Sequence, residues 1–150
     1  MKTIKTIKTQ AGILLTILVL ITSASFTAGP ECGSDEFLDK FAPALGDFTF
    51  IKAFNVVLKK ADEKNEFSYV FSKGSNYKIV ICDVNAEGNK MVVNFYDRNK
   101  KLIASNYLKS SKKFFPTINY ACSATGVYYV ESYFENGKSG CGVNILGFKS

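Results

Sequence analysis

The spacing of apolar and polar residues changes after about residue 46, and each part predicts a different element. Ser34 precedes two acidic residues, and apolar residues then recur at helical spacing as far as Phe41, which predicts a short N-terminal helix. Pro43 and Gly46 end it. Alternating or continuous apolar runs, separated by turn residues, then predict about eight antiparallel strands and an all-β sandwich. The expected strands are 48–58, 66–71, 77–84, 91–96, 102–106, 115–121, 126–134 and 141–148.

The first 28 residues carry the pattern of a secretory signal. A basic start with Lys2, Lys5 and Lys8 runs into an apolar block at 11–21 and then into small residues. The block is too short to span a bilayer, which takes about 20 apolar residues. We therefore expect a signal peptide at 1–28, a single β-sandwich domain at 29–150, a secreted, periplasmic or cell-surface location, and no stable membrane insertion after cleavage.

Charge and composition exclude several further classes of function. The full chain has 19 basic and 13 acidic residues, and three lysines belong to the predicted signal, so the remaining chain carries 16 − 13 = +3. This modest charge, with lysines paired on predicted loops, does not call for a nucleic-acid partner. The chain contains no histidine, which excludes Ser-His and Cys-His nucleophiles and histidine-ligated metal hydrolases. We expect no enzyme activity, no metal and no cofactor.

The four cysteines are Cys32, Cys82, Cys122 and Cys141, and all lie after the predicted signal. An even number of cysteines in an exported chain usually means disulfides. Three pairings are possible, and we favour Cys32–Cys82 with Cys122–Cys141. The first would hold the N-terminus, and the second would join neighbouring strands.

Asn136-Gly137 is the preferred sequence of a two-residue type I′ turn and predicts a C-terminal β-hairpin. With Glu135 opposite Lys138, side-chain alternation assigns one face of the hairpin to the core. The core face carries Tyr128, Val130, Phe134, Cys141, Val143 and Ile145, and the outer face carries Tyr129, Glu131, Tyr133 and Asn144.

The outer face of this hairpin is the candidate ligand-binding site. Two tyrosines flanking a carboxylate supply flat apolar surface with polar groups, which carbohydrate or peptide binders need. A structural role stays open, because the same register places Tyr133 over Gly140, and a tyrosine over a glycine shields exposed backbone without a ligand.

The segment from Met91 to Asn106, with Gly126-Val127-Tyr128-Tyr129-Val130 after it, resembles the bacterial pre-peptidase C-terminal domain. The shared pattern is an apolar strand ending in a Tyr96-Asp97 turn, a return strand with Leu102-Ile103-Ala104, and a later glycine followed by paired tyrosines. The resemblance covers about residues 66–134. It implies a jelly-roll-like sandwich that is not catalytic and assists secreted proteins in binding matrices or in stability.

These observations favour a secreted, non-catalytic binding module whose partner is an extracellular glycan or protein. The first alternative is a secreted inhibitor or effector that acts on another protein. A carboxylate-dependent hydrolase is the weaker alternative, since few acidic residues fall in predicted strand centres.

Overall fold

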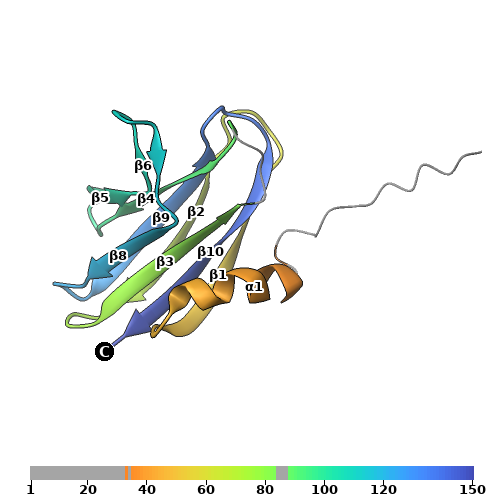
Figure 1. Cartoon of the computed structure of the whole chain (residues 1–150). Coiled ribbons are helices and arrows are strands. Elements are labelled where there is room, and N and C mark those ends of the chain that lie inside the picture. The colour runs from red at the N-terminus through yellow and green to blue at the C-terminus, as the bar shows by residue number, and fades with distance from the viewer. Residues whose placement is uncertain (1–32, 34, 84–87) are drawn as a thin grey trace, which may run out of the picture.

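The computed structural model describes residue 33, residues 35–83 and residues 88–150, and it shows an all-β sandwich with one short helix (Figure 1). The predicted signal at 1–28 and Cys32 lie outside the described residues. Across the described ranges, no helix is long and apolar enough to cross a membrane.

The helical elements are α1 (Asp35–Phe41) and the 3-10 helix η1 (Ala42–Leu45). The strands are β1 (Thr49–Leu58), β2 (Asn65–Phe71), β3 (Asn76–Asp83), β4 (Met91–Tyr96), β5 (Leu102–Ser105), β6 (Tyr107–Leu108), β7 (Lys113–Phe114), β8 (Thr117–Ala121), β9 (Gly126–Phe134) and β10 (Gly140–Lys149).

In the described part of the chain, eight strands form two antiparallel sheets, which confirms the predicted sandwich. Sheet A has the order β1-β10-β3-β8 and sheet B the order β2-β9-β4-β5. Consecutive strands mostly alternate between the sheets, so the chain winds around the core as a jelly roll does. Strands β6 and β7 form a separate two-stranded ribbon that the sequence did not predict.

The main core lies between the two sheets and is rich in aromatic rings. Phe71 stacks on Tyr77 with ring centroids 3.8 Å apart, and it also packs against Phe95 and Tyr128. Fully buried Met91, Val93 and Phe95 supply the β4 side of the core, as their alternation predicts. Phe54 and Phe67 stack at 3.6 Å between β1 and β2, and this pair covers the neighbouring edge of both sheets.

A second core lies on the other face of sheet A, beneath α1 and η1 (Figure 1). Phe37 and Leu45 pack on Val80, Val143 and Ile145. Lys78 ties η1 to the sheet because its ammonium donates to the Leu45 carbonyl at 2.9 Å. Sheet A is therefore covered on both faces, whereas sheet B has one face in the core and one face outward.

The predicted C-terminal hairpin is wrong. β9 pairs with β2 and β4 in sheet B, while β10 pairs with β1 and β3 in sheet A, so residues 135–139 connect the two sheets. A type I′ turn needs positive φ at both central residues, and of Asn136-Gly137 only Gly137 has it, at +62°. Of the predicted core face, Tyr128, Val130 and Phe134 lie between the sheets, but Val143 and Ile145 lie in the second core beneath α1.

Phe50 of β1 lies outside both cores, whereas Phe54 packs against the main core and Phe48 against the second core. The β1–β10 register shifts between Phe50 and Lys52, which interrupts the alternation, and Phe50 is 52% exposed.

The two predicted disulfides do not form, because Cys82 and Cys122 are both buried free cysteines. Cys82 lies in the second core beneath α1, and Cys122 lies in the main core, so each behaves as a small apolar side chain. Cys141 is not a free thiol.

We expect both free thiols to be inert in the folded protein and reactive after unfolding. Cys82 is completely buried, and burial, with a smaller contribution from the nearby Asp83, raises the pKa of its thiol to about 12. A thiol-reactive chromogenic disulfide should therefore label neither cysteine in buffer and both in concentrated denaturant, without added reductant. Labelling of the folded protein, or no labelling after unfolding, would contradict this assignment.

Tyr128 makes the fold sensitive to alkaline pH. Its hydroxyl donates to the Ala124 carbonyl at 2.8 Å, and burial followed by the hydrogen bonds with Tyr120 and Cys122 raises the pKa of Tyr128 above the usual phenol range. The unfolded phenol ionises near pH 10, so this contribution to stability is complete below about pH 10 and falls as the pH rises further. Melting temperatures at rising alkaline pH should fall less steeply for Tyr128→Phe than for the wild type. Parallel slopes would rule out Tyr128 as the source.

Candidate functional site

The candidate site lies on the outward face of sheet B, where β9 carries Tyr129, Glu131 and Tyr133. Each of the three is half-buried, and they alternate with inward Tyr128, Val130, Ser132 and Phe134. The outward placement of these three residues is therefore as predicted, because alternation within one strand does not depend on which strands pair. We call Tyr96, Tyr129, Glu131 and Tyr133 the tyrosine face.

Asn144 is not part of this face, which corrects the predicted group of four. It is 0% exposed and lies between the sheets, where its amide nitrogen donates to the Ser132 hydroxyl at 2.7 Å. The error has one physical cause. β10 belongs to sheet A, so the predicted register across the hairpin does not exist.

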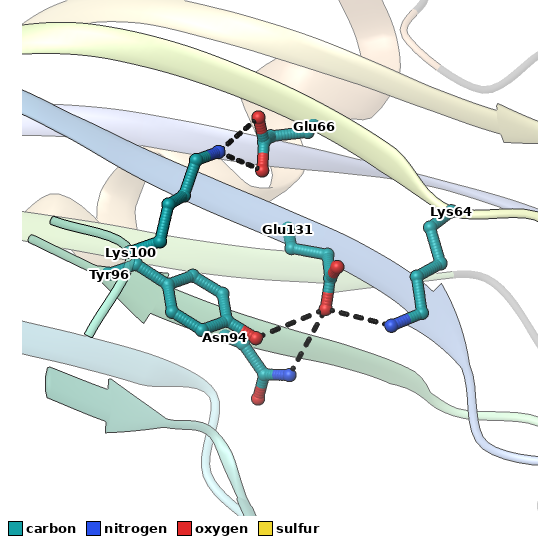
Figure 2. Close-up of polar contacts among 6 residues, drawn as sticks. All are labelled: Lys64, Glu66, Asn94, Tyr96, Lys100 and Glu131. Carbon is teal, nitrogen blue, oxygen red and sulfur yellow. Dashed lines mark hydrogen bonds and ion pairs between the residues drawn. The ribbon is translucent and has the colours of Figure 1, made fainter. Parts of the chain in front are cut away.

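Glu131 is the polar centre of the tyrosine face (Figure 2). One of its carboxylate oxygens accepts from Lys64 at 3.2 Å, from the Tyr96 hydroxyl at 3.2 Å and from the Asn94 amide at 3.4 Å. Its side chain is only 18% exposed, so these contacts are partly shielded from water. Burial and, next, the Glu131 charge raise the pKa of Tyr96, which keeps its hydroxyl a donor.

Two lysines resolve a charge conflict on this face. Glu66 of β2 and Glu131 of β9 are register partners, and like charges directly opposite each other destabilise a sheet. Lys64 pairs with Glu131, and Lys100 reaches both Glu66 oxygens at 2.6 Å (Figure 2). The four charges therefore form two ion pairs across the face.

The same lysines cover the tyrosine rings. The Lys100 ammonium lies 3.4 Å from the Tyr129 ring centroid, and the Lys64 ammonium lies 5.2 Å from that of Tyr133. Both distances are within the range of a cation–π contact. Each ring therefore has a cation over one side.

A tight turn between β4 and β5 places Lys100. One Asp97 carboxylate oxygen accepts from the Asn99 and Lys101 backbone at 2.8 and 2.9 Å, and Lys100 adopts φ +60°. This is the turn role that Asp and Asn residues commonly have. Asp83 likewise binds backbone, since its carboxylate accepts from the Met91 N–H at 3.0 Å.

Sequence reasoning missed Lys64, Lys100, Asn94 and Tyr96. The alternation of β4 carried a signal for the last two, because Asn94 and Tyr96 interrupt its apolar run at every second position. No sequence pattern indicated Lys64 or Lys100, because both lie outside the strands and their side chains reach the site only in the folded chain.

Hollows border the tyrosine face at both ends. Lys64 and Tyr133 line one together with Asp62 and Glu135. Arg98 and Lys101 line the other, together with Tyr120 of β8 and Thr125 from the connection before β9. The surface is thus aromatic in its middle and charged around it.

No family model matches the chain, and no curated protein matches it. Solved structures with a similar fold include PliG of Aeromonas hydrophila, a periplasmic lysozyme inhibitor of g-type lysozyme. It is 11% identical with a TM-score of 0.51, covering 69% of this chain and 89% of PliG. At that identity the likeness shows the fold alone.

A second similar structure is the pre-peptidase C-terminal domain of collagenase from Bacillus anthracis. It is 16% identical with a TM-score of 0.47, covering 65% of this chain and 88% of that domain.

Proposed function

We propose that this chain is an exported, non-catalytic protein-binding module of the inhibitor type, and that the tyrosine face is its contact surface. One observation carries the proposal: Tyr129 and Tyr133 lie outward on a sheet, with paired lysines and glutamates arranged around them. Tyrosine is enriched among residues that dominate binding energy at protein interfaces, and a charged rim around an aromatic centre is common there.

The lysine positions favour a protein over a glycan. A sugar that stacks on tyrosine needs an open ring face, and Lys100 and Lys64 lie over Tyr129 and Tyr133. A protein partner can keep both cation–π contacts and pack around the ring edges. For a protein, the lysines therefore form part of the contact surface, whereas a sugar would compete with them for the ring faces that they cover.

The fold of PliG supports g-type lysozyme as the first partner to examine. A sandwich of this shape can present a rigid sheet face together with loops at its ends, and the tyrosine face with its two bordering hollows is such a surface. We infer an inhibitor or other binding role rather than a reaction, because Glu66 and Glu131 are both engaged by lysines.

Export also belongs to this proposal. Residues 1–28 have the composition of a signal peptide, and removing them would release the sandwich to the periplasm, the cell surface or the medium. In that oxidising setting we propose one disulfide, between Cys141 and Cys32. Cys82 and Cys122 are free thiols, whereas Cys141 is not. Cys32 is the remaining cysteine of the sequence and therefore the proposed partner of Cys141.

Calorimetric titration of residues 29–150 against purified g-type lysozyme tests the proposed function, with chitin oligosaccharides titrated in parallel. We expect saturable binding of the lysozyme and no heat from the sugars. The sugar titration is repeated with the variant Lys64→Ala/Lys100→Ala, which removes the lysines from the rings of Tyr133 and Tyr129. Sugar binding that this variant strengthens and Tyr129→Ala/Tyr133→Ala abolishes would replace the protein-binding proposal with a glycan-binding one.

A further inference from the structure

A small ribbon, residues 107–115, stands away from the two sheets and contains β6 and β7 (Figure 1). We call it the hairpin arm. It contains Lys109, Lys112 and Lys113 and no acidic residue. All three lysines are exposed, so the arm is a concentrated positive charge on a chain of modest net charge.

The base of the hairpin arm is held firmly. Buried Asn106 accepts from the Val93 N–H at 2.7 Å and donates to the Met91 carbonyl at 3.1 Å, which ties the base to β4. Tyr107 stacks on Phe114 at 4.4 Å, and its hydroxyl donates to Glu135 at 2.8 Å. These contacts fix the orientation of the hairpin arm relative to sheet B.

The two faces of the hairpin arm differ. Tyr107 and Phe114 are register partners on the stacked face, so Leu108 and Lys113 share the opposite face. On this second face Leu108 is 48% exposed, and Phe115 beside the Lys113 ammonium is 40% exposed. Large apolar side chains next to lysines are thus presented to solvent on a fixed support.

The hairpin arm is also near the tyrosine face. Glu135, which anchors Tyr107, follows directly after β9 and lines the same hollow as Tyr133. A single partner of ordinary interface size can therefore reach both surfaces.

We propose that the hairpin arm docks into an acidic groove of a partner protein, a groove with carboxylates at its floor and apolar side chains on its walls. The inference rests on the proposed function, since it takes the partner to be a protein. The lysines complement carboxylates, and Leu108 and Phe115 lie on the flank where a groove wall would meet them. A lipid surface fits less well, because the tip itself is Lys109-Ser110-Ser111-Lys112 and would not enter a bilayer.

Two short synthetic peptides serve as probes, one of glutamate and leucine and one of glutamate and serine. Fluorescence anisotropy should show wild-type protein binding the leucine peptide more tightly, with an affinity that falls as salt is raised. The variant K109E/K112E/K113E should lose about ten-fold or more in affinity for both peptides, because three exposed ion pairs are lost and replaced by repulsion. The matched variant K59E/K73E/K138E, also on exposed lysines, should stay within about two-fold of wild type.

The variant Leu108→Ser/Phe115→Ser separates the apolar contribution to peptide binding from the electrostatic one. It should remove the preference for the leucine peptide and keep the salt dependence of the affinity. Equal loss in both charge variants, or no peptide binding by wild type, would overturn the inference. So would tighter binding to phosphatidylglycerol vesicles through the same lysines, or self-association that K109E/K112E/K113E abolishes. Peptide binding does not require the tyrosine face, so retained peptide binding with no lysozyme binding would count against the proposed function alone.

Discussion

Cys141→Ser should lower the free energy of unfolding by about 4–5 kcal/mol, measured by urea denaturation under non-reducing conditions. The proposed bridge to Cys32 closes a loop of about 110 residues, which strongly restricts the unfolded chain. In the folded chain, Cys141 pairs in register with Val57 of β1, and a side chain added at Gly33 would contact Asn55 of the same strand. The N-terminal part of the described chain therefore meets sheet A near Cys141.

The control for this prediction is the reductant. Wild type should lose the same stability when a strong thiol reductant is added, whereas Cys141→Ser should not respond. Cys122→Ser removes a free cysteine and should stay reductant-sensitive like wild type. A wild-type protein whose unfolding is the same with and without reductant would show that the bridge does not form.

Tyr129→Ala/Tyr133→Ala should weaken binding to g-type lysozyme roughly 100- to 1000-fold. Tyrosines at the centre of an interface commonly contribute about 2 kcal/mol each or more, and loss of both rings also leaves Lys100 and Lys64 without their cation–π partners. Affinity measured by calorimetry gives the comparison, and the melting temperature of each variant shows that the fold is retained.

A matched pair on the other sheet serves as the control. Phe50 and Val57 on β1 are about half exposed, and Phe50→Ala/Val57→Ala removes apolar surface without touching sheet B. We expect this variant to bind as wild type does. Equal weakening by the two double variants would mean that the tyrosine face has no special role.

The strands could be predicted because their signals are local. Alternation within β9 correctly separates outward Tyr129, Glu131 and Tyr133 from inward Tyr128 and Val130. The predicted helix likewise corresponds to α1, where acidic residues fill the first turn and Phe37 is buried.

The pairing of strands that are distant in the sequence could not be predicted from such local signals. Asn136-Gly137 fits a hairpin locally, but Phe134 belongs in the main core with sheet B, and Val143 belongs beneath α1 on sheet A. Burying both apolar sets requires the chain to cross between sheets, and this requirement overrides the local turn preference. Asn144 was misplaced by this one error, and Lys64 and Lys100 were missed because long side chains from loops can reach many places.

Site-specific photocrosslinking tests the central claim most directly. A benzoylphenylalanine at position 133 should crosslink to g-type lysozyme, whereas the same group in place of exposed Asn119 on β8 of sheet A should not. Crosslinking from position 119 with none from position 133 would place the contact on the wrong sheet and contradict the account.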